Sequence, residues 1–344
     1  MKAVVHDGRG GVRVAEVPDA ELLDPGDAVV RVRRAAVCGT DLHVLAHHDG
    51  LPAGTTLGHE FVGEVVAVGA AVSAHWVGDL VAGADFSACG TCWWCRRGHH
   101  WECPERRFFG TGTTFGPALA GAQAELVRVP FADATLQAVP SGVSADRAVF
   151  LGDTLATGYA AVRRTGAQPG DTVAVLGGGP VGQLCSLVAQ ACGAGVVLLV
   201  EPVEARRALA AQEGAVAVEP DRARAVLDGL TDGRGADAVV DAVGGRVGLD
   251  MAFGLVRRAG TVVSVGVPAS TEWAMPVERA FVDELTVGFA VGNYLRDGAP
   301  VGALVRSGLV DPLALGPLTV GLDEAPEAYR AMIDRRTLKT LIAF

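Results

Sequence analysis

The chain has 344 residues, a length that predicts two or three domains. Half of the residues are hydrophobic and 20% are charged, which excludes a disordered chain and a small scaffold that depends on disulfides. The formal charge of −10, without a run of basic residues, argues against nucleic acid and anionic membranes as partners. Glycine supplies 46 residues, which indicates many tight turns and at least one close approach of the backbone to a ligand.

Three local features bear on the location of the protein. The N-terminal segment 1–8 has no apolar stretch of the kind found in secretion signals. Residues 172–200 carry no charge, but Gly177-Gly178-Gly179-Pro180 interrupts them, so two strands around a helix are a better interpretation than a membrane span. Four of the seven cysteines lie between Cys89 and Cys103, which favours metal binding over disulfides. These features predict a cytoplasmic protein that does not bind membranes.

The first part of the chain is predicted to be rich in strands, with β-branched runs at 2–5, 28–36 and 61–68. From about Asp171 to Gly266, predicted strands at 172–176, 196–200, 238–241 and 261–265 alternate with predicted helices at 180–192, 203–212, 221–230 and 247–258. This alternation is typical of a doubly wound parallel sheet. The tail from about Asn293 includes a predicted helix at 324–333.

A glycine-rich turn follows the first strand of the alternating region. Gly177, Gly179 and Gly182 match the G-x-G-x-x-G pattern, in which glycines allow a tight turn, the approach of a pyrophosphate and close packing of helix on strand. Glu201 follows the next strand, where a carboxylate can accept both ribose hydroxyls and repels a 2′-phosphate. The pattern predicts NAD in preference to NADP. Alternatively, Glu201 is a solvent-exposed charge, and Arg206 either lines the ribose or is a solvent-exposed helix charge.

Four cysteines, Cys89, Cys92, Cys95 and Cys103, have the spacing C-x2-C-x2-C-x7-C. Four thiolates so close in sequence can surround one tetrahedral Zn²⁺ and leave no position for a substrate, so the pattern predicts a structural zinc site. Four buried thiols without metal are the alternative. A zinc ribbon that binds nucleic acid would use similar ligands, but the acidic composition and the lack of a basic flank argue against it.

Two further segments contain metal-ligating residue types, Cys38-Gly39-Thr40-Asp41-Leu42-His43 and Gly58-His59-Glu60. Together with the glycine-rich turn and the four cysteines, and in this order, they resemble the zinc-dependent medium-chain alcohol dehydrogenase family over essentially the whole chain. The most specific match is Gly58-His59-Glu60-x-x-Gly63-x5-Gly69-x-x-Val72. Val265-Gly266-Val267-Pro268 and Lys339-Thr340 match as well.

The resemblance implies a catalytic zinc ion with Cys38 and His59 as its first two ligands. The third ligand position falls on Asp153, where the best-known members have cysteine and several bacterial members have aspartate. Zn²⁺ accepts a carboxylate oxygen as well as a thiolate, and the charge of the site stays the same. The harder ligand should leave the zinc a stronger Lewis acid. Asp153 is also well placed to cap a helix that begins at Thr154, which is the competing interpretation.

The resemblance also implies roles for neighbouring residues. Thr40 would hydrogen-bond the substrate oxygen at the metal, and His43 would pass the proton outward. Asp41 would orient the imidazole of His59, and Glu60 would lie behind the zinc. The implied cofactor contacts are Lys339 on the pyrophosphate and the set Gly177, Gly179, Pro180, Val181, Gly182, Glu201, Arg206, Val265, Val267 and Val291. His47 and His48 are expected to be exposed loop residues.

The sequence therefore predicts an α/β enzyme in which a Rossmann domain, with a doubly wound parallel sheet, is inserted into a β-rich catalytic domain with a four-cysteine zinc lobe. The predicted domains are 1–154 with 291–344 (catalytic) and 155–290 (NAD-binding). The predicted reaction is reversible hydride transfer between an alcohol or carbonyl compound and NAD. Segment 108–121 has no charged anchor, which favours a small uncharged substrate.

The expected cofactors are NAD and two Zn²⁺ per chain, one catalytic and one structural, in a homo-oligomer that is a dimer or a tetramer. Two alternatives remain open. One is a biosynthetic ketone or aldehyde reductase of the same fold that uses NADH or NADPH. The other is a non-catalytic zinc protein that binds dinucleotides.

Overall fold

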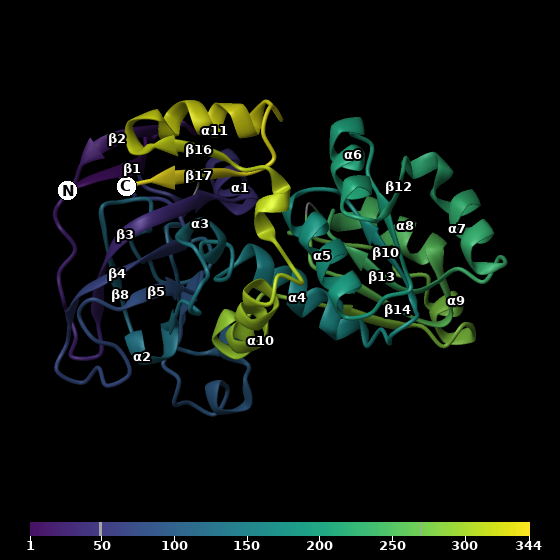
Figure 1. Ribbon diagram of the computed structural model, residues 1–344, viewed down its shortest axis with the longest axis horizontal. Helices are drawn as coiled ribbons and strands as arrows, with labels where there is room; N and C mark the ends of the chain where they lie inside the picture. The colour runs from purple at the N-terminus through teal and green to yellow at the C-terminus, as the bar shows by residue number, and fades with distance from the viewer. Residues whose placement is uncertain (48–49, 269) are drawn as a thin grey trace. The chain divides into compact units, whose positions relative to one another are not determined.

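The computed structural model describes residues 1–47, 50–268 and 270–344 (Figure 1). They form two compact units: unit 1 contains 1–156, 293–307 and 316–344, and unit 2 contains 157–292 and 308–315. The sequence prediction placed 308–315 with the catalytic domain. Its helical turn η5 (Pro312–Leu315) packs against a helix of unit 2, and Val310 and Leu315 are buried. This short segment therefore belongs to the Rossmann unit.

Unit 1 is built on a seven-stranded sheet in the order β16-β17-β3-β4-β5-β9, with β8 also paired to β3. Only β16 and β17 pair in parallel. The strands are β3 (Ala28–Val37), β4 (Glu60–Val68), β5 (Leu80–Gly83), β8 (Leu126–Val129), β9 (Leu136–Ala138), β16 (Leu318–Gly321) and β17 (Thr340–Ala343). Two small antiparallel pairs complete the unit: β1 (Lys2–His6) with β2 (Val12–Glu16), and β6 (Phe86–Ser87) with β7 (Arg107–Phe108).

The helices of unit 1 are α1 (Gly39–Ala46), α2 (Ala132–Thr135), α3 (Ala145–Ala148), α10 (Tyr294–Arg306) and α11 (Ala325–Ile333). Helix α11, which corresponds to the predicted helix at 324–333, lies beside β16 and β17 (Figure 1). Much of the two central strands is buried, and Val30 of β3 and Phe61 of β4 belong to one hydrophobic core cluster. Helix α4 (Thr154–Thr165) begins in unit 1 and continues into unit 2.

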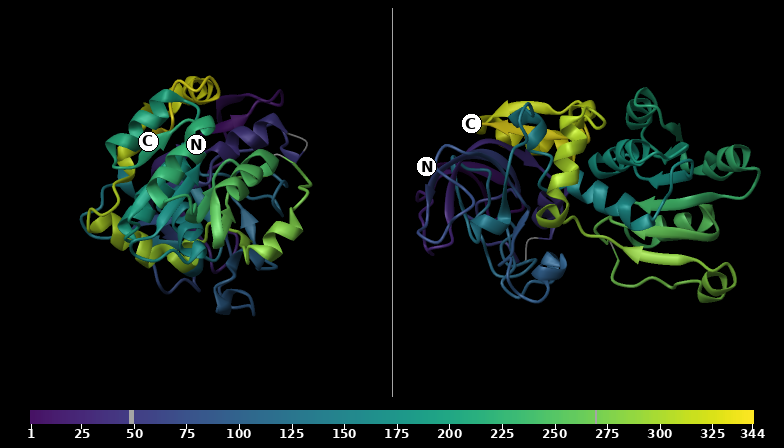
Figure 2. Two further views of the ribbon diagram at one scale, coloured as in Figure 1. Left: turned by 90° about the vertical axis from the view of Figure 1, so that its right-hand side faces the viewer. Right: turned by 60° about the horizontal axis from the view of Figure 1, so that its bottom comes forward.

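Unit 2 contains a six-stranded sheet, all of whose pairs are parallel, in the order β12-β11-β10-β13-β14-β15. The strands are β10 (Thr172–Leu176), β11 (Val196–Val200), β12 (Val216–Val218), β13 (Ala236–Asp241), β14 (Val256–Ser264) and β15 (Thr286–Phe289). Helices α5 (Pro180–Ala191) and α6 (Glu204–Gln212) cover one face, and α7 (Ala223–Thr231) and α8 (Gly245–Leu255) cover the other (Figures 1 and 2). Helix α9 (Val277–Val282) precedes β15. The doubly wound parallel sheet is confirmed.

Two sequence interpretations of this unit have clear outcomes. The charge-free segment 172–200 forms β10, α5 and β11, and no helix of the described residues is long and apolar enough to cross a membrane. The predicted helix 247–258 is wrong at its end, because Val256 pairs with Ala236 of β13 and begins β14. Ala259 then adopts a left-handed conformation with φ of 53°, at an irregularity in this pairing.

Candidate metal and cofactor sites

Cys38, His59 and Asp153 come together in unit 1 from three separate elements. Cys38 is the N-cap of α1, His59 directly precedes β4 and Asp153 directly precedes α4. The Asp153 Oδ2 atom lies 3.3 Å from Cys38 Sγ and 3.3 Å from His59 Nε2. A tetrahedral shell of ligands about 2.0–2.3 Å from one ion has edges of about 3.3–3.8 Å, so this spacing fits Zn²⁺. His59 Nε2 is buried and faces the Asp153 carboxylate, which also fits a metal ligand.

The electrostatics of this cluster favour a cation. Burial, with Asp153 nearby, raises the pKa of the Cys38 thiol to about 12. Burial by itself lowers the pKa of His59, but Asp41 and Cys38 raise it well above its usual range. Burial by itself raises the pKa of Asp153, but the hydrogen bond from His59 lowers it below its usual range. The Asp41 and Asp153 carboxylates thus lie on either side of the buried imidazole, an arrangement that favours a cation at this position.

Helix α1 presents the other residues that were expected near the substrate. The Asp41 carboxylate accepts a hydrogen bond from the backbone N–H of Cys38 at 2.9 Å and faces His59 Nδ1 at 3.3 Å. Thr40 and His43 are half-buried and share a helix face at a spacing of three residues. The His43 ring packs on that of the exposed His47 at 4.6 Å, and His48 lies outside the described residues.

Glu60 lies next to Cys38, His59 and Asp153 and is paired with the buried ammonium group of Lys339. A carboxylate oxygen of Glu60 is within 4.8 Å of the Cys38, His59 and Asp153 ligand atoms. Its Oε1 atom accepts hydrogen bonds from Lys339 Nζ at 2.5 Å and from Thr154 Oγ1 at 2.8 Å. Burial by itself lowers the pKa of Lys339, but the Glu60 carboxylate raises it. Lys339, which the resemblance assigned to the cofactor pyrophosphate, is thus buried in an ion pair with Glu60.

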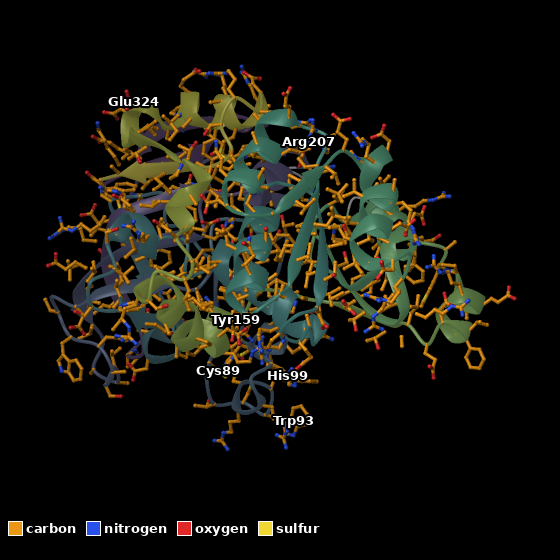
Figure 3. All side chains as sticks on the ribbon, turned by 45° about the vertical axis from the view of Figure 1, so that its right-hand side comes forward. Cys89, Trp93, His99, Tyr159, Arg207 and Glu324 are labelled. Carbon is orange, nitrogen blue, oxygen red and sulfur yellow. The ribbon has the colours of Figure 1, made fainter. Side chains whose placement is uncertain are left out.

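The four cysteines form a second cluster in the segment around η2 (Cys95–Arg97) and η3 (His100–Glu102), and their sulfur atoms lie within 4.8 Å of one another. The Cys89 and Cys103 sulfurs are 3.5 Å apart. Burial opposes ionisation of Cys89, but the backbone N–H groups of Thr91 and Cys92 lower its pKa to about 6. Figure 3 shows Cys89 nearer the body of unit 1 and Trp93 farther out on this lobe. Four sulfurs at this spacing fit one tetrahedral zinc ion with no position for substrate.

The glycine-rich turn of unit 2 has the geometry that a dinucleotide pyrophosphate needs. Gly177 follows β10 with φ of 89°, a conformation that favours glycine. A Cβ atom on Gly182 would lie 1.8 Å from the Gly177 carbonyl oxygen, so only glycine lets α5 pack this closely. Gly179 is the N-cap of α5, followed by Pro180 and Val181, and a Cβ atom there would meet nothing within 4 Å. The start of α5, where the first N–H groups have no partner within the helix, is thus unobstructed at Gly179.

Glu201 follows β11, but it is not the solvent-exposed charge that was the alternative interpretation, since it is only 3% exposed. Its carboxylate accepts hydrogen bonds from the backbone N–H groups of Gly178 at 2.6 Å and Val203 at 2.8 Å. Arg206 Nη1 lies 3.8 Å from Glu201 Oε2. The carboxylate is therefore held rigidly beside the glycine-rich turn. Val265 and Val291 follow β14 and β15, and Val267 lies two residues after Val265, so these residues also lie at the carboxyl ends of the parallel strands.

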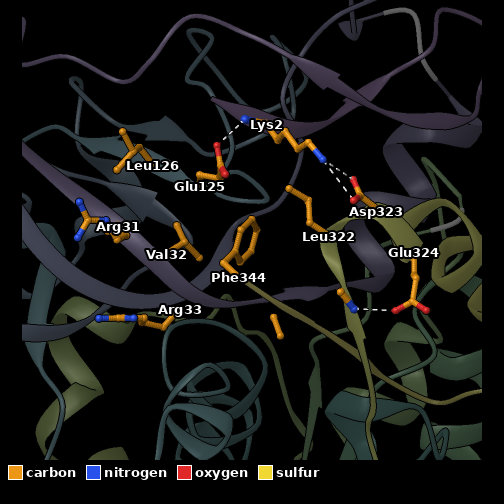
Figure 4. Close-up of a pocket in the computed structure, with 12 residues that line it drawn as sticks. Lys2, Arg31, Val32, Arg33, Glu125, Leu126, Leu322, Asp323, Glu324 and Phe344 are labelled. Atoms are coloured by element: carbon orange, nitrogen blue, oxygen red, sulfur yellow. Dashed lines mark hydrogen bonds and ion pairs between the residues drawn. The ribbon is translucent and has the colours of Figure 1, made fainter.

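Two open grooves in unit 1 lie away from the Cys38 cluster. One, of about 800 Å³, borders the four-cysteine lobe at Cys89 and His100. The other, of about 760 Å³, is shown in Figure 4. Its charges are largely paired internally, since Lys2 Nζ contacts Asp323 and the Lys2 backbone N–H contacts Glu125. Neither groove is lined by Cys38, His59 or Asp153.

Sequence reasoning missed several buried polar residues around the metal cluster. Gln123 and Tyr329 are hydrogen-bonded to each other and, through Gln123, to Asp41. Thr154 contacts both Glu60 and Lys339. Burial and the nearby Asp153 raise the pKa of Asp85, which is also buried. A single polar residue between two alanines, as in Ala122-Gln123-Ala124, was the only local signal.

Comparisons with known proteins find matches along most of the chain. Residues 24–141 match the family model of the alcohol dehydrogenase GroES-like domain, and residues 180–304 match that of zinc-binding dehydrogenases. The chain is 38% identical over 331 residues to a probable zinc-binding alcohol dehydrogenase of Mycobacterium tuberculosis, covering 96% of this chain and 84% of that protein.

Solved structures are similar over the full length. The alcohol dehydrogenase TADH from Thermus sp. ATN1 has a TM-score of 0.96 and 37% identity, and the match covers 100% of this chain and 99% of that one. A zinc-binding dehydrogenase structure from Sinorhizobium meliloti, bound to NADP, has a TM-score of 0.86 and 29% identity, with coverage of 100% and 99%.

Proposed function

The chain belongs to the zinc-dependent medium-chain alcohol dehydrogenase family, and we propose that it transfers hydride reversibly between a small uncharged alcohol and NAD. The observation that carries the proposal is the convergence of Cys38, His59 and Asp153, in which Asp153 lies 3.3 Å from each of the other two donor atoms, in a chain that also forms a second cluster of four cysteines. One open and one closed set of ligands is the combination that a catalytic and a structural zinc ion need.

The residues around the first cluster support this chemistry. When bound, zinc supplies a Lewis acid that favours loss of the alcohol proton, and NAD accepts the hydride. Cys38 and Asp153 hold the cation with two negative charges, and Asp41 orients His59. The Thr40 hydroxyl would accept a hydrogen bond from the alcohol and, as it takes up the alcohol proton, release its own proton, which His43 would carry outward. Partial burial and the neighbouring His47 lower the pKa of His43, which favours the neutral form of its imidazole.

NAD is proposed as the cofactor because Glu201 is held against the glycine-rich turn by two backbone N–H groups. A 2′-phosphate near this carboxylate would meet a like charge in a poorly solvated position. The structural relative bound to NADP uses a different cofactor from the one proposed here. The same residues can reduce a ketone or aldehyde, since the reaction is reversible and substrate supply sets its direction.

A homo-oligomer and a cytoplasmic location are also proposed. The homo-oligomer is supported by an apolar surface on unit 2, where Phe281 of α9 and Phe289 of the edge strand β15 are 83% and 62% exposed. Light scattering that finds only monomer would contradict it. The cytoplasmic location is supported by the free thiols of the four-cysteine lobe, which a reducing compartment would keep available for metal. Secretion with disulfides in this lobe would contradict it.

The test of the proposed function compares two substitutions of Asp153. Asp153→Asn removes a negative charge from the ligand set, so zinc retention should fall by more than the about 10–100-fold typical for residues that only orient ligands. Activity should be lost while the zinc of the four-cysteine lobe and the binding of NAD are kept. Asp153→Cys should retain zinc and part of the activity, because Zn–S bonds are only about 0.2–0.3 Å longer than Zn–O bonds.

The outcome separates a ligand from a helix cap. If Asp153 only caps α4, Asp153→Asn should be nearly silent and Asp153→Cys should lower the free energy of unfolding by about 1 kcal/mol. Zinc content is measured for both variants. Their activity is followed as NADH absorbance with a panel of primary, secondary and cyclic alcohols. An active Asn variant with two zinc ions would disprove the proposed ligand set.

A further inference from the structure

A chain of buried hydrogen bonds extends from His59 to the C-terminal helix α11. The Tyr329 hydroxyl donates to Gln123 Oε1 at 2.8 Å. Gln123 Nε2 donates to the Ala36 carbonyl oxygen at 3.1 Å and to Asp41 Oδ2 at 3.3 Å. All four side chains of the chain, those of Tyr329, Gln123, Asp41 and His59, are at most 2% exposed. A buried network of this kind stabilises one arrangement only, because any other leaves polar groups without partners.

The orientation of the Gln123 amide is determined by its partners. Ala36 and Asp41 offer only acceptors, so the NH₂ group must face them. The opposite end is then the carbonyl oxygen, which needs a donor. Burial raises the pKa of Tyr329 well above its usual range, so its hydroxyl keeps the proton that it donates. Without this hydroxyl the amide oxygen would be buried with no donor among its contacts.

Gln123 in turn determines which oxygen of Asp41 is available to His59. Asp41 Oδ2 already accepts from the Cys38 backbone N–H at 2.9 Å and from Gln123. Oδ1 has no other partner among the described residues and lies 3.3 Å from His59 Nδ1. A neutral imidazole that donates from Nδ1 to this oxygen has its lone pair on Nε2, the atom that faces Cys38 and Asp153.

The backbone is adapted to this position of Gln123. Gly58, which precedes His59, has φ of 92°, and a Cβ atom there would lie 2.4 Å from Gln123 Cγ. Gly58 therefore admits the Gln123 side chain directly behind the ligand. The Gln123 backbone N–H also donates to the Leu57 carbonyl oxygen at 2.9 Å, so side chain and main chain are held together.

We propose that Gln123, oriented by Tyr329, is a positioning residue of the metal centre that fixes Asp41 and thereby holds His59 with Nε2 toward Cys38 and Asp153. The proposal rests on the proposed ligand role of Cys38, His59 and Asp153. Its consequence is that α11, far from the ligands in sequence, controls how firmly the catalytic metal is held. Replacing Gln123 should weaken metal affinity by about 10–100-fold, as for other residues that orient ligands.

The experiment measures the release of metal from the native protein into a chromophoric chelator. The variants are Gln123→Met, Tyr329→Phe and the double variant. The matched controls are Gln137→Met and Tyr294→Phe. Gln137 donates to the Tyr294 carbonyl oxygen, outside the chain of hydrogen bonds from Tyr329 to His59. Gln123→Met should release the catalytic-site metal about 10–100 times faster than the wild type, and Tyr329→Phe should also release it faster. The controls should match the wild type.

The double variant should release metal no faster than Gln123→Met, because Tyr329 acts through Gln123. A role in fold stability alone would lower the melting temperature and leave the release rate unchanged, which would overturn the proposal. Faster release in the controls, or independent effects of the two substitutions, would do the same. If Gln123→Met does not fold, Tyr329→Phe decides, and release at the wild-type rate overturns the proposal.

A His59→Ala variant separates this proposal from the proposed function. Wild-type metal retention in His59→Ala would refute the ligand assignment itself. Rapid release in His59→Ala together with wild-type release in Gln123→Met would refute only the role of Gln123.

Discussion

The buried ion pair between Lys339 and Glu60 leads to a prediction about stability. Lys339 Nζ and Glu60 Oε1 are 2.5 Å apart, and their side chains are 1% and 0% exposed. Lys339→Met leaves a buried carboxylate whose remaining partner is the Thr154 hydroxyl. Breaking a buried pair in this way costs about 3–5 kcal/mol, a large part of the about 5–15 kcal/mol that stabilises a typical domain. We expect a loss of this size in the free energy of unfolding of unit 1.

Urea denaturation followed by tryptophan fluorescence measures this loss, because four of the five tryptophans lie in unit 1: Trp76, Trp93, Trp94 and Trp101. The control is Lys2→Met, which breaks the exposed contact with Asp323 and should cost about 0–1 kcal/mol.

A double variant that combines Lys339→Met with Glu60→Gln completes the test. The double variant buries neither charge, so its loss should be well below the sum of the two single losses. A cost below about 1 kcal/mol for Lys339→Met, or additive losses, would refute the buried pair as a stabilising contact. Cofactor affinity, measured separately, tests whether Lys339 also contacts the pyrophosphate: an unchanged affinity for NAD in folded Lys339→Met would argue against that contact.

Two further predictions concern the bound groups. A chelator should remove the zinc held by Cys38, His59 and Asp153 and abolish activity, while the four-cysteine lobe keeps its ion and the fold is retained. Metal analysis that finds one zinc ion per chain in fully active enzyme would contradict this prediction. Steady-state kinetics should favour NAD over NADP by about 10- to 100-fold in kcat/KM, or roughly 1–3 kcal/mol, because of the Glu201 carboxylate. Glu201→Ala should reduce this preference, and equal kinetics with both cofactors in the wild type would show that Glu201 does not set it.

The sequence by itself determined the features that depend on residues close together in the chain. The predicted strands 172–176 and 196–200 coincide with β10 and β11, because alternating strands and helices leave apolar runs bounded by turn residues. The four-cysteine cluster was predictable for the same reason, since its ligands lie within one short segment. Residue types at Cys38, His59 and Asp153 indicated a metal centre only when combined with the resemblance to a family.

The tertiary structure decided which distant residues surround these sites. Lys339 contacts Glu60 across 279 residues of sequence, and Tyr329 contacts Gln123 across 206. It also decided that the Glu201 carboxylate is buried, and that 256–258 belongs to a strand rather than continuing a helix. Periodicity and spacing describe a segment's own conformation, whereas a buried polar group takes its partner from whichever element the packing brings against it. That choice depends on the whole fold, and no local pattern contains it.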